Sequence, residues 1–191
     1  MDERFHHRVL IELFNRLFKH AHGTILVRGD EEPLYLPASK QEGRLHHQVV
    51  FAHGYFASAL HETAHWCIAG KRRRLLTDFG YWYQPDGRSN EQQRAFERVE
   101  VKPQALEWIF SQSCGFPFKF SVDNLDGEVG DLGPFKANVH AQVMHYLEHG
   151  LPRRADHFAT SLREHYGTDL LSPNDFEGAK DTGRGALSGS L

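Results

Sequence analysis

Residues 54–70 read GYFASALHETAHWCIAG, and this stretch decides how the rest of the chain is interpreted. Small alanines alternate with bulky apolar residues, which predicts a closely packed helix ending at Gly70. Within that helix His61 and His65 stand four positions apart, so both imidazoles lie on one face and can bind the same metal ion. Glu62 lies next to the first of them. Helix geometry thus predicts two metal ligands and an adjacent carboxylate.

A site with two histidines needs a third ligand, which is commonly a carboxylate from a later helix. A helix is predicted over residues 91–110, and it carries Glu97 and Glu100 three positions apart. We favour Glu100, because its neighbours Val99 and Val101 indicate that this part of the helix points inward. The other glutamate could then orient a ligand from outside the site. The pattern also allows both to be solvent-exposed acids, so it does not decide the third ligand.

The elements on either side of the motif predict an α+β fold with helices packed on a small sheet. Apolar residues at steps of three and four predict helices over 5–20, 135–149 and 153–166. Short β-prone runs predict strands over 24–27, 34–36 and 49–52, and further aromatic strands over 79–83 and 116–122. Pro103 is expected to kink or restart the helix around it.

The length of 191 residues predicts a single domain. We place that domain at residues 1–177. From residue 178 to 191 the chain is rich in Gly and Ser and has no apolar repeat, so this tail is predicted to be disordered.

The composition excludes several classes of protein. No apolar run approaches the ~20 residues of a membrane span, and the first residues do not resemble a secretion signal, so we expect a cytoplasmic protein. Two cysteines, Cys67 and Cys114, do not form a disulfide framework. A net charge of -3 gives no polycationic field, so direct nucleic-acid binding is not expected.

Other motifs must be weighed against the high count of 14 histidines. Residues 145–149, HYLEH, match an inverted metal motif but fall at the predicted end of a helix, where solvated His and Glu are usual. His53 and His140 are expected in core or supporting roles. The cationic run Lys71, Arg72, Arg73, Arg74 either stays solvated after a helix end or docks an acidic macromolecule beside the metal site.

The predicted ligand set serves two chemistries. With Zn²⁺ it activates water, and Glu62 would be the general base of a peptidase or amidase. With Fe²⁺ the same donors form the facial triad of oxygenases. The motif does not choose between them, and taken alone the residue pattern favours the zinc hydrolase.

Longer blocks of sequence add a resemblance that is far more specific than the five-residue motif. The chain resembles the elongation factor P hydroxylase (EpmC) family over most of its length, to about residue 177. The stretches that carry the resemblance are 29–37 (GDEEPLYLP), 50–54 (VFAHG), 61–71 (HETAHWCIAGK), 78–83 (DFGYWY), 85–88 (PDGR) and 99–106 (VEVKPQAL).

The resemblance implies an enzyme that hydroxylates the β-lysylated lysine of elongation factor P, with zincin-like metal-binding helices. It implies metal binding by His61, His65 and Glu100, with Glu62 supporting the site or moving protons. Hydroxylation needs an oxidising metal–oxygen chemistry that Zn²⁺ lacks, so Fe(II) with molecular oxygen is expected. The sequence contains no Gly-x-Gly-x-x-Gly motif and does not identify the reductant. The acidic partner implied by the family would suit the run from Lys71 to Arg74.

Overall fold

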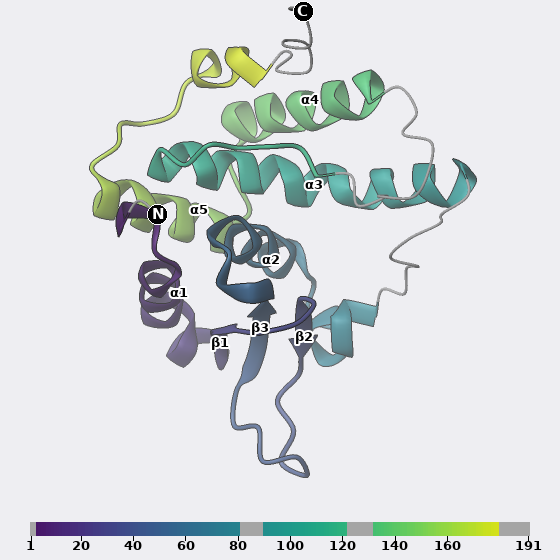
Figure 1. Ribbon diagram of the computed structural model, residues 1–191, viewed down its shortest axis with the longest axis vertical. Helices are drawn as coiled ribbons and strands as arrows, with labels where there is room; N and C mark the ends of the chain where they lie inside the picture. The colour runs from purple at the N-terminus through teal and green to yellow at the C-terminus, as the bar shows by residue number, and fades with distance from the viewer. Residues whose placement is uncertain (1–2, 81–89, 122–131, 180–191) are drawn as a thin grey trace, which may run out of the picture.

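The computed structural model describes residues 3–80, 90–121 and 132–179 (Figure 1). Its sheet has three strands, β1 (Thr24–Arg28), β2 (Leu34–Leu36) and β3 (His47–Phe51), in the order β1-β3-β2. β3 pairs in parallel with β1 and antiparallel with β2. Leu26, Tyr35 and Val49 are buried on this sheet, as their strand-forming side chains predict. The three predicted strands are confirmed within one or two residues.

Helix α1 (His7–His22) covers the sheet at β1 and ends at Gly23, whose positive φ of 59° suits the left-handed cap. Its buried face is apolar and consists of Leu10, Leu13, Phe14 and Phe18. Asn15 fastens the helix to the sheet, because its Oδ1 accepts a hydrogen bond from the backbone N–H of Leu26 at 2.9 Å. The predicted helix is thereby confirmed, as is its end at Gly23.

A tight turn leads from β3 into the motif helix α2 (Phe56–Ile68). The turn is the short 3₁₀ segment η2 (Ala52–Gly54), in which His53 and Gly54 have φ of 49° and 73°. A Cβ at Gly54 would lie 3.1 Å from Arg28 Nε and 3.3 Å from the His7 ring, so glycine suits both the backbone and the space. This turn directs α2 between the sheet and α3 (Figure 1).

Helix α3 (Asn90–Cys114) passes through Pro103 without a break, so of the two outcomes expected there, a kink or a restart, the restart is wrong. A proline inside a helix costs about 3 kcal/mol through its missing N–H and its steric clash. The ten residues that follow Pro103, up to Ser113, are buried with the exception of Gln112. Each large apolar side chain among them contributes roughly 1.5–3 kcal/mol on burial, which outweighs the proline defect.

Three more helical segments complete the described fold around α3. Helices α4 (Gly133–His149) and α5 (Arg153–Tyr166) both pack against α3, and the 3₁₀ segment η5 (Pro173–Ala179) lies against α4. Figure 1 shows α2, α3 and α4 as successive layers above the sheet. The structure confirms the predicted α+β architecture, including the predicted helices 135–149 and 153–166.

Two of the predicted aromatic strands are wrong where the structure describes them. Residues 115–121 form no strand; instead Phe118 stacks on Trp108 of α3 at 5.1 Å and Phe120 meets the same ring edge-on at 5.4 Å. The alternating phenylalanines therefore cover a helix. Phe79 belongs to the 3₁₀ segment η4 (Thr77–Gly80), and residues 81–83 and 122 lie outside the described residues.

Both cysteines are free, in agreement with the prediction that they form no disulfide framework, and both are buried. Among the described residues no helix is long and apolar enough to cross a membrane. The predicted disordered tail at 178–191 lies outside the described residues except for its first two positions, which belong to η5.

Candidate metal centre

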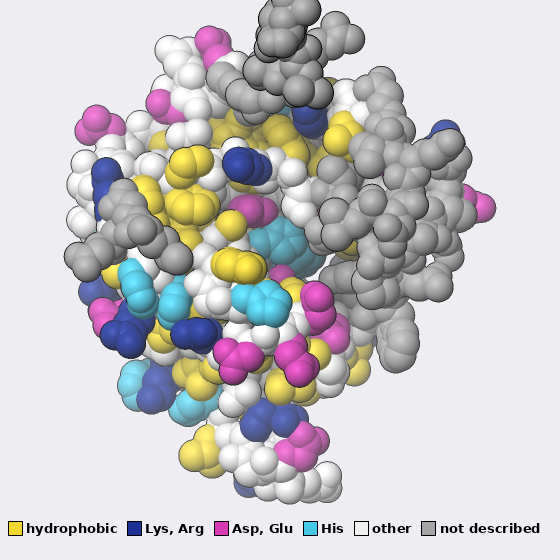
Figure 2. Space-filling model, in the orientation of Figure 1, with side chains coloured by type: hydrophobic (Ala, Val, Ile, Leu, Met, Phe, Trp, Pro, Cys, Tyr) yellow, Lys and Arg dark blue, Asp and Glu magenta, His cyan; other side chains and the backbone are white. Residues whose placement is uncertain are grey.

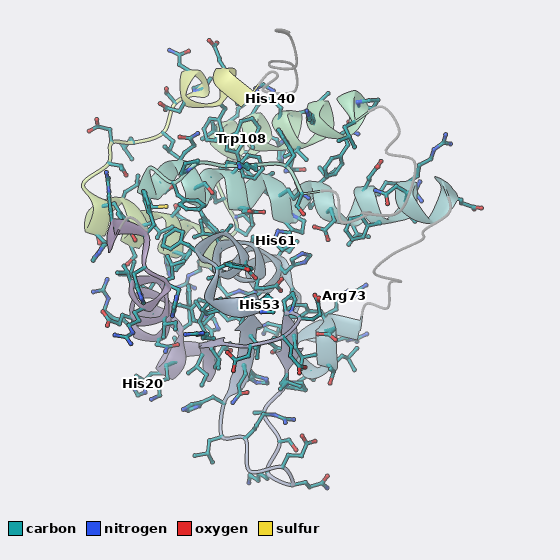
Figure 3. The ribbon with its side chains drawn as sticks, in the orientation of Figure 1. His20, His53, His61, Arg73, Trp108 and His140 are labelled. Atoms are coloured by element: carbon teal, nitrogen blue, oxygen red, sulfur yellow. The ribbon has the colours of Figure 1, made fainter. Side chains whose placement is uncertain are left out.

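Helix α2 directs both motif histidines toward α3. The Nε2 atoms of His61 and His65 lie 3.0 Å apart, and the two rings meet edge-on with centroids 4.7 Å apart. In Figure 3 the His61 ring lies between α2 and α3. Four-residue spacing on a helix produces this arrangement, because positions i and i+4 lie one above the other.

Helix α3 supplies the third donor of the cluster, Glu100. Its side chain is only 2% exposed, with Oε2 3.5 Å from His61 Nε2 and Oε1 3.4 Å from His65 Nε2. One possible ligand atom from each of the three residues lies within 4.8 Å of the others. The structure therefore brings together the three residues that the sequence analysis named.

Glu97 does not join this cluster, although it lies less than one turn away on the same helix. Its Oε1 accepts a hydrogen bond from Gln93 Nε2 at 3.2 Å, and its side chain is half-buried. Of the two glutamates considered, only Glu100 points at the histidine pair.

A second carboxylate, which was not predicted from the sequence, contacts the ring nitrogen of His61 that faces away from the cluster. Glu107 lies two turns beyond Glu100 on α3, and its Oε2 is 2.8 Å from Nδ1 of His61. A proton on Nδ1 donated to this carboxylate leaves Nε2 with its lone pair directed at Glu100 and His65. Carboxylates commonly hold metal-binding histidines in this way. The spacing of seven residues from Glu100 is the signal that could have identified Glu107.

The cluster is electrostatically suited to a cation. Burial lowers the pKa of His61, but the Glu107 carboxylate, aided by Glu100 and Glu62, outweighs burial and raises that pKa to about 10. Burial also raises the pKa of Glu62, with the nearby imidazoles acting in the opposite direction. Figure 2 shows histidine and acidic side chains near the middle of this face. The carboxylates thus favour positive charge on the His61 imidazole, and metal binding would displace that proton.

The spacing of the donors fits a single divalent ion. Two nitrogens each about 2.1 Å from one ion lie about 3.0 Å apart at a right angle and about 3.4 Å apart at a tetrahedral angle. The separation of the two Nε2 atoms, 3.0 Å, and that of His65 Nε2 from Glu100 Oε1, 3.4 Å, fall in that range, and the other Glu100 oxygen lies just beyond it at 3.5 Å from His61 Nε2. Zn²⁺ and Fe²⁺ both accept two imidazoles and a carboxylate, so the donors fit either ion.

A cleft of about 760 Å³ adjoins the cluster on the side of His65. It runs between the end of α2 and α3, and the first three residues of the cationic run line it. Lys71 and Arg72 are exposed, while Arg73 donates a hydrogen bond to the carbonyl oxygen of Phe79 at 3.0 Å. Arg74 is half-buried and lies over the Trp66 ring at 5.9 Å.

The remaining histidine motifs lie away from the cluster. His145, Glu148 and His149 are all exposed at the end of α4, and His149 Nδ1 donates to the carbonyl oxygen of His145 at 3.1 Å. His53 is exposed in its turn, and the ring of His140 lies 6.0 Å from that of Trp108. Figure 3 shows both at a distance from the interface between α2 and α3.

The fold and the cluster together define an α+β protein with a candidate two-histidine, one-carboxylate centre at the contact of two helices. The model of the elongation factor P hydroxylase family, EpmC, matches residues 13–176, a span that includes every donor described above. The chain belongs to the elongation factor P hydroxylase family. It is also 52% identical over 160 residues to the elongation factor P lysine hydroxylase of Haemophilus influenzae, which covers 84% of this chain and 89% of that protein.

Proposed function

We propose that this protein hydroxylates the β-lysylated lysine of elongation factor P at a non-heme metal site formed by His61, His65 and Glu100. Membership of the family and the name of the relative from Haemophilus influenzae support the reaction and the substrate. The observation that carries the assignment to these residues is their convergence from two helices, within 4.8 Å of one another.

The proposed ion is Fe(II), with molecular oxygen as oxidant. Bound iron would supply the redox chemistry that attack on an unactivated C–H bond requires, which Zn²⁺ does not offer. Three ligands on one side of an ion leave other coordination positions open, as in the facial triads of iron oxygenases. Zinc or another divalent ion fits the same donors and is distinguished by metal analysis.

Residues of this chain have separate tasks in the proposed reaction. His61, His65 and Glu100 hold the ion, and Glu107 fixes the orientation of the His61 ring through Nδ1. Glu62 follows His61 directly and is half-buried, so we assign it to holding or moving a proton beside the ligands. The pairing of an HExxH helix with a carboxylate on a later helix supports the proposed likeness to zincins.

Elongation factor P is proposed to dock at the run formed by Lys71, Arg72, Arg73 and Arg74. The exposure of Lys71 and Arg72 beside the cleft supports this role, since cations at an interface rim steer an acidic partner. Arg74 is less available, because it is half-buried against Trp66.

A zinc-dependent peptidase or amidase is the alternative, with Glu62 as general base. The same three donors and the adjacent glutamate favour it. It differs from the hydroxylase in the expected metal and in the mass change of the substrate.

The experiment incubates the purified protein with β-lysylated elongation factor P under air, with an electron donor supplied in the form of cell extract filtered to retain small molecules, and measures the intact mass of the substrate. Metal content is determined in parallel on protein prepared without added zinc. A gain of one oxygen atom that is lost in His61→Ala and kept in Glu97→Gln supports the proposal. Cleavage of the substrate by a zinc-containing protein would establish the alternative, and an unchanged substrate with full iron content and an electron donor supplied would refute both activities.

A further inference from the structure

The cleft beside His65 has cationic walls contributed by two separate segments. Lys71, Arg72 and Arg73 follow the end of α2, and Lys102 lies on α3, two residues after Glu100. Among the described residues that line this cleft there is no carboxylate. Cations gathered in a cleft with low-dielectric walls raise the local concentration of anions. The cleft is therefore suited to an anion.

The same charges make the cleft unsuitable for the modified lysine. The ε-nitrogen of the modified lysine is an uncharged amide, but the β-lysyl extension carries two amino groups, so this extension would face like charges on both walls of the cleft. Carboxylates instead lie around the cluster, where Glu62, Glu100 and Glu107 all act on the charge of His61. The substrate cation is expected on that carboxylate-rich side, which leaves the cleft to a second molecule.

The other walls and the size of the cleft indicate a small organic molecule. Apolar side chains from five segments contribute to the lining, namely Ile68, Phe79, Val99, Pro103, Tyr146 and Pro152. A volume of about 760 Å³ with mainly apolar walls and a few charged groups is typical of small-molecule sites. His65 lies in the lining, so a molecule bound here would contact one of the three candidate metal ligands.

Hydroxylation has an electron requirement that such a molecule would meet. Insertion of one oxygen atom of O₂ into a C–H bond oxidises the carbon by two electrons, and the second oxygen atom needs two more. No described residue set identifies a flavin or a nicotinamide. The missing reductant is therefore expected to bind next to the metal ligands.

We infer that the cleft binds a small 2-oxo acid and that this anion is the two-electron reductant, an inference that rests on the proposed function. In the overall reaction the lysine C–H becomes C–OH with one oxygen atom of O₂. The bond between C1 and C2 of the 2-oxo acid breaks, CO₂ leaves, and C2 gains the other oxygen atom as a carboxylate. Each organic reactant loses two electrons and O₂ gains four, so no further reductant is required.

Lys102 is the residue that best tests this inference. It is exposed, it lies in the cleft lining, and no described contact assigns it another partner. Arg73 is a weaker choice because its guanidinium donates to Phe79 and so shapes the cleft. Lys119, an exposed lysine that does not line the cleft, provides a matched control for the loss of one positive charge.

Calorimetric titration of 2-oxoglutarate into the zinc-loaded protein measures binding without turnover. We expect saturable binding that Lys102→Gln weakens by about tenfold at low salt, as for a hydrogen bond to a charged group. Lys119→Gln is expected to leave the affinity unchanged. Succinate, which keeps both carboxylates and lacks the oxo group, should bind more weakly than 2-oxoglutarate.

Absence of saturable binding at millimolar 2-oxoglutarate, or equal weakening by both lysine variants, would overturn the inference. The mass of β-lysylated elongation factor P, measured with the iron-loaded protein and 2-oxoglutarate, separates this failure from failure of the proposed function. Oxygen gain without release of succinate means that the protein is a hydroxylase with another reductant. Binding of 2-oxoglutarate with no oxygen gain means that the proposed function is wrong while the anion site stands.

Discussion

Nδ1 of His61 lies 2.8 Å from Oε2 of Glu107, two helical turns beyond the glutamate that faces the other nitrogen of the same ring. One helix therefore contacts both sides of one imidazole. The contact with Glu107 selects the tautomer of His61, and the contact with Glu100 completes the candidate ligand set. This arrangement explains why a glutamate that is only 6% exposed occupies the core between α2 and α3.

The first prediction concerns Glu107. Glu107→Ala removes the acceptor for His61 Nδ1–H, so the ring loses its fixed orientation and the affinity for zinc should fall by about 10–100-fold. Glu107→Gln keeps an amide oxygen as acceptor, so its affinity for zinc should fall less than that of Glu107→Ala. Chelator competition on the purified variants measures both values. Unchanged affinity in Glu107→Ala would show that the ring is oriented by something else.

The second prediction separates the two glutamates of α3. Glu100→Gln removes a charged donor from the cluster, so its loss of metal affinity should exceed the about 10–100-fold expected for a supporting contact. Glu97 lies three residues away and contacts Gln93, so Glu97→Gln should retain the metal affinity of the unmodified protein. The same chelator assay compares them. A larger loss in Glu97→Gln would transfer the role of ligand to that residue.

Sequence periodicity predicted the helices and the small sheet well because those elements bury one face each. Residues 153–166 match α5 from end to end, and its apolar positions repeat at three and four residues. The failures occurred where long-range packing decides the structure. The phenylalanines at 116, 118 and 120 alternate as in a strand, yet at least two of them serve to cover Trp108, a contact that local spacing does not reveal.

The candidate site was predictable in part for a similar reason. The spacing of His61 and His65 fixes their relative position within one helix, but the choice of Glu100 over Glu97 depends on how α3 is rotated against α2. Glu107 stands between Leu106 and Trp108 in an apolar stretch, so its burial is visible in the sequence although its partner is not. The cleft depends on residues far apart in the chain, such as Lys71 and Tyr146, and only the fold brings them together.

The third prediction tests docking at the cationic run. Arg72→Glu reverses an exposed charge that does not contact the donor cluster, so it should raise the KM for β-lysylated elongation factor P several-fold. Because Arg72 also lines the cleft, kcat is compared at saturating 2-oxoglutarate, where it should be unchanged. The effect should shrink as salt is raised from low to physiological concentration, because exposed charges are screened. Arg8→Glu on the exposed surface of α1 is the control. Equal KM values for the two variants would show that the cationic run is a solvated surface with no role in docking.

The fourth prediction concerns Arg154, which holds the end of the motif helix. Its Nη2 lies within hydrogen-bond distance of the carbonyl oxygens of Trp66, Cys67 and Ala69, at 3.0, 2.9 and 2.6 Å, and its guanidinium lies 4.7 Å from the centre of the Trp66 ring. These carbonyls belong to the last turn of α2 and to its C-cap residue Ala69, where backbone acceptors have no helical partner and a positive charge is favourable. Arg154 therefore stabilises the helix immediately after His65.

Arg154→Met should lower the free energy of unfolding by about 1.5–3 kcal/mol, because a charged donor is lost and buried carbonyls are left without it. Arg153→Met, at the exposed neighbouring position, should change stability by no more than about 0.5 kcal/mol. Urea unfolding followed by circular dichroism measures both variants. Since α2 carries both histidines, Arg154→Met should also weaken zinc binding in the chelator assay, whereas Arg153→Met should not. Equal stability of the two variants would mean that the end of α2 is held by its packing alone.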